Sequence, residues 1–334
     1  MAPDAALCGA MARLIAPGSG PNPGQPYALV VAEGEAAATD IDPAFLVALL
    51  RSRGAVLLRG FPPSIEQLQT VTGRLCSGSV FNESPDRALI DPAHNIQSVN
   101  GGADAFPLHP ELSREPWKPD VCFFHCLIPP DQGGETVICD GVALADALPP
   151  AVRAGLERHR LFYIQPAPPW QLAHWFGTET PDEAMLAAPP ASCPYRFMRI
   201  GDRLARVFSR PALHRTLFGD ARAFGNFILF ARDYLGRGDF PLLDDGRPVP
   251  DDWVAAIRAA AAPLTVPVAW QAGDLLILDN SRFMHGRNPI ADPSARLIAS
   301  NFGYLRDVAR DPEGPALQPW RQGIFVPPRP VVSV

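Results

Sequence analysis

The chain has 334 residues, of which 47% are hydrophobic, and its formal net charge is -6. This composition supplies enough apolar side chains for a folded core and excludes a largely disordered chain. Acidic and basic residues are interspersed, without the basic stripe that binds nucleic acid, and no apolar run reaches the roughly 18 residues that span a membrane. We therefore expect neither a nucleic-acid nor a membrane partner.

The N-terminal segment has the composition of a loosely attached arm. Residues 17–26 read PGSGPNPGQP, so residues 1–26 are predicted to form an arm and a Pro/Gly linker ahead of a single domain over residues 27–334. The first residues lack a sustained apolar segment, and no signal peptide is expected. The six cysteines contain no C-x-x-C pair and do not indicate a disulfide framework or a zinc site. A cytoplasmic location follows as the expectation.

Three helices are predicted among the strands of this domain. The first begins after Asp42, with a proline in its first turn, and ends at Gly54. The second opens at Ser64–Gln67, which has the form of a capping box, and runs to about Cys76. The third covers about 142–158.

The remaining predicted elements are short runs that are rich in β-forming residues and bounded by Gly and Pro. They predict strands at 27–33, 55–59, 96–100, 121–128, 135–139, 161–165, 224–231, 264–270, 274–279 and 295–305. Many short strands with flanking helices predict a mainly β fold with a jelly-roll (double-stranded β-helix, cupin-like) core. No G-x-G-x-x-G motif or regular strand–helix alternation indicates a dinucleotide-binding fold. The Pro-rich stretch 166–195 is expected to be an irregular surface insertion, and the insertion or lid is placed at about 166–200.

Two histidines and one glutamate occur in settings that suit a metal ion. His109 and Glu111 are two residues apart near a probable strand end, where side chains at i and i+2 share one face. His285 follows the strand 274–279 after a short turn and could supply a third ligand. Two histidines and one carboxylate form the facial triad of non-haem Fe(II) oxygenases. Zinc with the same ligands stays an alternative, although the H-E-x-x-H helix motif of metalloproteases is absent.

In its ordered set of motifs the chain resembles the TauD/TfdA group of Fe(II)/2-oxoglutarate dioxygenases. Within that group it is similar to the clavaminate-synthase-like and SyrP-like members, which have Glu in the H-x-D/E motif. The resemblance extends from about residue 50 to 305 and is carried by AVLLRGF (55–61), FNESPDR (81–87), FPLHPEL (106–112), PPDQGGET (129–136) and WQAGDLLILDNSRFMHGR (270–287), followed by Arg296.

Specific site residues follow from this resemblance. It implies His109, Glu111 and His285 as Fe(II) ligands, with 2-oxoglutarate and O2 as co-substrates. Arg296, eleven residues after His285, would pair with the distal carboxylate of 2-oxoglutarate, and Thr136 would hydrogen-bond the same group.

The expected reaction is hydroxylation of an unactivated C–H bond in a small molecule. Glu111 fills the position that Gly or Ala occupies in the family's halogenases, which disfavours halogenation. Sulfonate-type members have a second Arg four residues after the 2-oxoglutarate Arg, and Ser300 stands there. The resemblance therefore indicates an amino acid or an amino-acid-derived metabolite, free or tethered to a carrier protein.

The sequence is also compatible with other reactions, substrates and protein classes. Desaturation or cyclisation could come from the same oxidant, and a nucleoside, phosphonate or alkyl acid could be the substrate. A non-catalytic jelly-roll binding protein and a zinc hydrolase are the rival classes. Gln97, Ser98 and Asn100 are candidate substrate-binding residues, because relatives often present polar groups to the substrate before the H-x-D/E strand.

Overall fold

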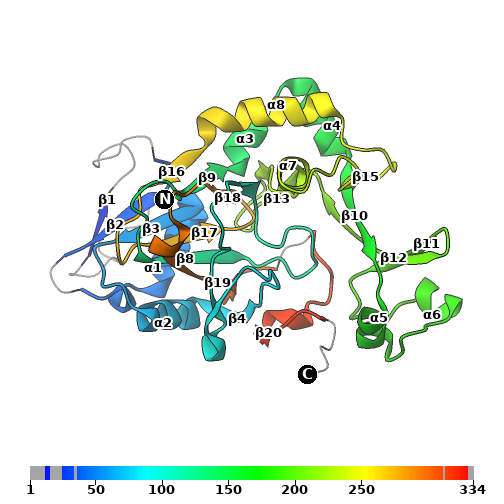
Figure 1. Cartoon of the computed structure of the whole chain (residues 1–334), viewed down its shortest axis with the longest axis horizontal. Coiled ribbons are helices and arrows are strands. Elements are labelled where there is room, and N and C mark those ends of the chain that lie inside the picture. The colour runs from blue at the N-terminus through cyan, green and yellow to red at the C-terminus, as the bar shows by residue number, and fades with distance from the viewer. Residues whose placement is uncertain (1–11, 16–24, 34–35, 311–312, 330–334) are drawn as a thin grey trace.

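A computed structural model describes residues 12–15, 25–33, 36–310 and 313–329 (Figure 1). Most of the predicted arm over residues 1–26 lies outside these ranges. Two β-sheets form the centre of the protein. The larger sheet contains the strands β1 (Ala12–Ile15), β2 (Ala28–Ala32), β3 (Ala55–Arg59), β4 (Cys76–Val80), β5 (Leu89–Asp91), β6 (Ile96–Ser98), β8 (Val121–Ile128), β17 (Leu275–Asp279), β19 (Leu297–Leu305) and β20 (Gly323–Phe325). Eight of them follow the order β1-β2-β3-β17-β8-β19-β4-β20, while β6 pairs with β19 and β5 with β6.

The smaller central sheet carries most of the residues that matter for function. It consists of β7 (Phe106–His109), β9 (Thr136–Asp140), β16 (Val266–Val268) and β18 (Phe283–Arg287), in the order β16-β9-β18-β7. Phe124 and Phe302 of the larger sheet share one hydrophobic core with Ile138 and Met284 of the smaller sheet. Two packed sheets with flanking helices confirm the predicted jelly-roll fold class.

Outside the projecting lobe described below, the described ranges contain six α-helices and several 3-10 turns. The helices are α1 (Pro43–Arg53), α2 (Ile65–Leu75), α3 (Gly141–Ala147), α4 (Pro150–Arg158), α7 (Ile228–Asp233) and α8 (Asp251–Ala261). The 3-10 turns are η2 (Ala38–Asp40), η3 (Pro92–His94), η4 (Ala262–Leu264), η5 (Pro293–Ala295) and η6 (Pro319–Arg321). No helix in the described ranges is both long and apolar enough to cross a membrane.

The first helix forms as predicted, whereas the cap of the second does not. The Asp42 carboxylate accepts a hydrogen bond from the Ala44 amide, and Gly54 ends α1 in a left-handed conformation with φ of 77°. Helix α2 begins after Ser64, but the Ser64 hydroxyl donates to Glu66 and the Gln67 side chain accepts from the Ala38 amide. The predicted capping box is therefore wrong, because a tertiary contact takes the Gln67 side chain.

Two other predicted elements differ from the structure. The helix expected over 142–158 is divided into α3 and α4 where Pro149 and Pro150 interrupt it. The strand expected over 224–231 is wrong, since these residues form a turn and the start of α7. Asn226 explains the change, because its side-chain oxygen accepts the Ile228 amide and its amide donates to the Ala212 carbonyl.

A second lobe projects from the central sheets and includes the predicted insertion (Figure 1). It contains β10 (Arg160–Pro166), α5 (Pro169–Phe176), α6 (Glu183–Ala187), β11 (Arg196–Ile200), β12 (Arg203–Pro211) and β15 (Leu242–Leu243). The four strands form one sheet in the order β11-β12-β10-β15. A separate pair, β13 (His214–Arg215) and β14 (Arg222–Ala223), follows β12. The stretch 166–195 is thus not irregular: α5 and α6 lie within it, and the long β10–β12 pairing holds it in place.

Candidate metal centre and adjoining pocket

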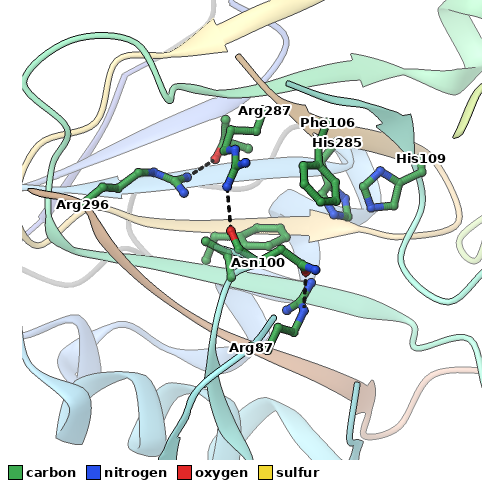
Figure 2. A pocket seen from close by; sticks show the side chains of 11 residues that line it. Arg87, Asn100, Phe106, His109, His285, Arg287 and Arg296 are labelled. Carbon is green, nitrogen blue, oxygen red and sulfur yellow. Dashed lines mark hydrogen bonds between the residues drawn. The ribbon is translucent and has the colours of Figure 1, made fainter. Parts of the chain in front are cut away.

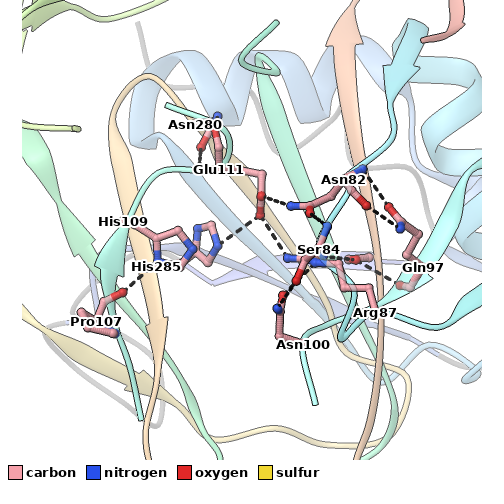
Figure 3. Close-up of polar contacts among 11 residues, drawn as sticks. Asn82, Ser84, Arg87, Gln97, Asn100, Pro107, His109, Glu111, Asn280 and His285 are labelled. Atoms are coloured by element: carbon pink, nitrogen blue, oxygen red, sulfur yellow. Dashed lines mark hydrogen bonds and ion pairs between the residues drawn. The ribbon is translucent and has the colours of Figure 1, made fainter. Parts of the chain in front are cut away.

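The smaller sheet places the two predicted histidine ligands opposite each other. β18 pairs with β7 in a register that puts His285 across from His109, and their ring centroids are 4.6 Å apart. Glu111 follows β7 in the next turn, with its carboxylate Oε2 3.6 Å from Nε2 of His285 (Figure 3). One donor atom from each of these three residues lies within 4.8 Å of the others. Residues from two distant segments thus converge on one point.

The position of Glu111 does not come from strand geometry alone. β7 ends at His109, so the two side chains do not share one strand face as the spacing predicted. Instead, Asn280 holds the backbone of Glu111 at both ends, accepting from its amide at 2.8 Å and donating to its carbonyl at 3.0 Å. Asn280 directly follows β17, so the larger sheet fixes the turn that carries this carboxylate.

The protonation states of His109 and Glu111 suit metal binding. Nδ1 of His109 donates to the Pro107 carbonyl at 2.8 Å, which leaves Nε2 free as a ligand atom. Burial, together with the neighbouring His285, lowers the pKa of His109 to about 3, so this imidazole is neutral near pH 7. Burial by itself would raise the pKa of Glu111, but Arg87 and the two histidines lower it to about 2. A neutral imidazole beside an ionised carboxylate fits the donor set that Fe(II) takes in facial triads.

A pocket of about 400 Å³ adjoins this cluster and is lined by both histidines (Figure 2). Arg296, at the start of β19, lies across the pocket from His109, and Arg87 and Arg287 line it as well. Phe106 and Phe124 add apolar wall. The pocket therefore combines a metal-type donor cluster with an excess of positive charge.

Arg296 and Thr136 lie together on this wall, as the sequence predicted. Nη2 of Arg296 donates to the Thr136 hydroxyl at 3.4 Å, and the same hydroxyl accepts from the Trp270 indole at 3.2 Å. Nε of Arg296 is buried without a hydrogen-bond partner, and no carboxylate of the described residues forms an ion pair with this guanidinium. Burial and the nearby Arg287 lower the pKa of Arg296 to about 10, so it remains charged at pH 7. A partly buried cation without an ion-pair partner carries a desolvation cost, and a bound carboxylate would compensate it.

The three candidate substrate residues have different surroundings. Asn100 lines the pocket. Gln97 is turned to the backbone of Asn82, accepting from its amide at 3.0 Å and donating to its carbonyl at 2.9 Å. Ser98 accepts the Ala88 amide through its hydroxyl at 2.8 Å. Gln97 and Ser98 do not line the pocket, and their side chains support the segment next to it.

Two arginines of the pocket were not among the predicted site residues. Arg287 donates to the backbone carbonyls of Asn100 and Asp104 and so holds the loop that leads into β7. Arg87 has a side chain that is only 5% exposed, and it contacts Glu111. Arg87 lies in the FNESPDR segment, and Arg287 lies two residues after His285. Both therefore belong to segments that carry the family resemblance, but the sequence did not indicate what their side chains contact.

A further buried carboxylate connects the metal-type cluster to the second lobe. Glu115, four residues after Glu111, accepts from Nε2 of Gln165 at 3.2 Å and from the Tyr195 hydroxyl at 3.0 Å. Arg206 of β12 lies 3.6 Å from the same carboxylate. Three residues of the lobe thus converge on the turn that follows the H-x-E motif.

Comparison with known proteins identifies the class of this protein. The family model described as "Taurine catabolism dioxygenase TauD, TfdA family" matches residues 23–300. The chain therefore belongs to the TauD/TfdA family and is an Fe(II)/2-oxoglutarate-dependent dioxygenase. A clavaminate synthase-like protein of Arabidopsis thaliana is 28% identical over 297 residues, which cover 77% of this chain and 83% of the relative.

Solved structures show the same fold at low sequence identity. PvcB from Pseudomonas aeruginosa matches with a TM-score of 0.57 and 15% identity, covering 90% of this chain and 94% of PvcB. PvcB is described as an Fe, alpha-ketoglutarate dependent oxygenase from an isonitrile synthetic pathway. A taurine dioxygenase from Burkholderia xenovorans matches with a TM-score of 0.56 and 15% identity, covering 86% of this chain and 89% of that enzyme.

Proposed function

We propose that His109, Glu111 and His285 hold Fe(II), and that Arg296 and Thr136 bind the distal carboxylate of 2-oxoglutarate. The observation that carries this proposal is the partly buried guanidinium of Arg296, which lines one pocket with His109 and His285 of the donor cluster and has no carboxylate ion-pair partner among the described residues. A keto-diacid that reaches from the donor cluster to Arg296 would satisfy both ends of the pocket.

The residues of the pocket have separate tasks in this proposal. Iron with 2-oxoglutarate and O2 supplies an oxidant for C–H bonds and leaves succinate and carbon dioxide. Arg296 and Thr136 fix the co-substrate, and Phe106 and Phe124 keep water from the reacting end. The Glu111 carboxylate occupies the place that a halide would need, so hydroxylation is the proposed outcome.

The proposed substrate is an amino acid or an amino-acid-derived metabolite, free or tethered to a carrier protein. Two features bear on this choice of substrate. Arg87 and Arg287 line the pocket in addition to Arg296, which gives three guanidinium groups against the single carboxylate of Glu111. Ser300 stands where sulfonate-type members have an arginine, and the Arabidopsis relative carries a clavaminate synthase-like name.

We further infer that residues 27–334 form one catalytic domain in which the second lobe acts as a lid. Its support is the convergence of Gln165, Tyr195 and Arg206 on Glu115, because this contact couples the lobe to the turn beside the metal-type cluster. Lids of this kind close over a substrate and exclude water.

Anaerobic titration with Fe(II) and 2-oxoglutarate tests the proposed function. The chelate is expected to give a weak visible absorption band in the wild-type protein, and His109→Ala or His285→Ala should abolish it. The same variants should release no succinate when O2 is then admitted. Absence of a band in the wild type would favour a binding protein without catalysis. Activity with zinc and without oxygen consumption would instead indicate a hydrolase.

A further inference from the structure

Both oxygens of the Glu111 carboxylate are contacted from a single segment, residues 81–87 (Figure 3). Nδ2 of Asn82 donates to Oε1 at 2.5 Å. Nη2 of Arg87 lies 3.4 Å from Oε2, the oxygen that also faces Nε2 of His285. These two residues stand near opposite ends of the FNESPDR motif, which is one of the segments that carry the family resemblance.

The orientation of Asn82 is fixed by its neighbours. Its side-chain oxygen accepts the Ser84 amide at 2.8 Å, so its NH2 group must face Glu111. Gln97 holds the Asn82 backbone through the pair of hydrogen bonds described above. The donor that meets Oε1 is therefore held in place before any ligand binds.

Arg87 is fixed as firmly as Asn82. Its Nε donates to Oδ1 of Asn100 at 2.8 Å, and its Nη1 donates to the Ser300 hydroxyl at 3.1 Å. The guanidinium also lies over the ring of Phe302, 5.0 Å from its centroid. Each nitrogen of the fork thus has a partner, and the one aimed at Glu111 has little freedom to turn away.

We propose that Asn82 and Arg87 are positioning residues that hold Glu111 as a one-oxygen iron ligand, with Oε2 directed at the metal and Oε1 retained by Asn82. The inference rests on the proposed function of the site. A carboxylate that swung to bind through both oxygens would occupy one of the three positions that co-substrate and oxygen need. Partners of metal ligands commonly set metal affinity, and their loss costs about 10–100-fold.

The test uses anaerobic Fe(II) binding and the absorption band of the 2-oxoglutarate chelate, neither of which requires the substrate. Asn82→Ala and Arg87→Met are each expected to weaken Fe(II) affinity about 10–100-fold and to shift the band. Arg87→Lys, which keeps the charge but not the fork, should recover part of the affinity. Arg321→Met is the matched control, since it removes another buried arginine ion pair, with Asp120, that does not touch Glu111; its Fe(II) affinity should equal that of the wild type.

The outcomes separate this inference from the proposed function. Wild-type affinity and an unshifted band in Asn82→Ala and Arg87→Met would overturn the positioning role while leaving the oxygenase assignment intact. A wild-type protein that binds no Fe(II) would overturn both. If Arg87→Met does not fold, Asn82→Ala and Arg87→Lys decide. Asn82→Ala introduces only a small side chain, and Arg87→Lys keeps the positive charge beside Glu111.

Discussion

Arg296 combines three properties that single it out at the residue scale: it is partly buried with an enclosed Nε, it is charged, and no carboxylate of the described residues forms an ion pair with it. Thr136 lies within reach of its Nη2 and is itself held by Trp270. A folded protein keeps such a cation only where the rest of the structure compensates its burial or where a ligand does. We therefore expect these two side chains to determine most of the affinity for 2-oxoglutarate.

Arg296→Ala should raise the 2-oxoglutarate concentration that half-saturates the visible band by about 10–100-fold, because a hydrogen bond to a charged group contributes about 1.5–3 kcal/mol. Thr136→Val should raise it less, by up to about tenfold, as only a neutral hydroxyl is lost. Fe(II) affinity should stay unchanged in both. Unchanged 2-oxoglutarate dependence in Arg296→Ala would contradict its assignment.

The low pKa of His109 predicts a pH-dependent stability of the metal-free protein. In the unfolded chain this imidazole takes up a proton below its ordinary pKa of 6.5, whereas the folded form does so only near 3. Its contribution to stability is therefore complete above pH 6.5 and is lost as the pH falls toward 3. Between pH 7 and pH 5 the wild type should lose about 1–2 kcal/mol more than His109→Gln, which cannot titrate. Urea denaturation at both pH values measures the difference, and equal losses would contradict the prediction.

The site residues could be predicted from sequence where a motif assigns both a residue and its partner. His109, Glu111 and His285 meet, as do Arg296 and Thr136. The contacts of Asn82 and Arg87 could not be predicted, because they depend on the path of an irregular segment beneath Glu111. Gln97 was visible as a polar residue near the site, but only the structure shows that it faces Asn82 rather than the pocket.

At the scale of elements, strand pairing over long distances decides which predictions hold. β8, β17 and β19 are mostly apolar and almost entirely buried, and the sequence identifies all three as strands. The apolar run at 224–231 is equally compatible with a helix, and the side chain of Asn226 selects that alternative. The insertion at about 166–200 was predicted, but the helices inside it were not, because its proline-rich sequence obscures short helices that depend on the β10–β12 pairing.

Glu115→Gln should loosen the second lobe without disturbing the metal centre. The variant removes the charge that pairs with Arg206, and loss of one partner of a buried ion pair commonly costs about 3–5 kcal/mol. Trypsin should then cleave the arginine-rich strands β11 and β12 roughly tenfold faster or more. The Fe(II)/2-oxoglutarate band should not change.

Glu183→Gln is the control within the same lobe, because its pair with Arg199 is exposed and contributes little. Equal cleavage rates for Glu115→Gln and the wild type would contradict the role of Glu115 as the anchor of the lobe.

At the scale of the whole molecule, the described C-terminal segment closes the larger sheet. β20 pairs with β4 in parallel, and the side chain of Trp320 is buried. Arg321 donates to both oxygens of Asp120 at 2.9 and 2.5 Å, and Asp120 also accepts the Leu305 amide. A residue just before β8 thereby connects the end of the chain to β19.

Arg321→Met should lower the free energy of unfolding by about 3–5 kcal/mol, because it leaves Asp120 charged and buried without its partner. Arg199→Met, which breaks the exposed pair with Glu183, should change it by less than about 1 kcal/mol. Urea titration of both variants checks the contrast. A small effect of Arg321→Met would show that the segment is held by apolar packing alone.

β7 is the outermost strand of the smaller sheet and has hydrogen-bonded strand neighbours on one side only. Because His109 ends β7 and faces His285 on β18, an ion shared by the two rings would link the two strands at this edge of the sheet. Deuterium uptake at Phe106–His109 should therefore slow when the enzyme is loaded with metal, while uptake in the central strand β19 stays the same. Without its metal, this protein would then be expected to open first at the sheet edge that carries His109.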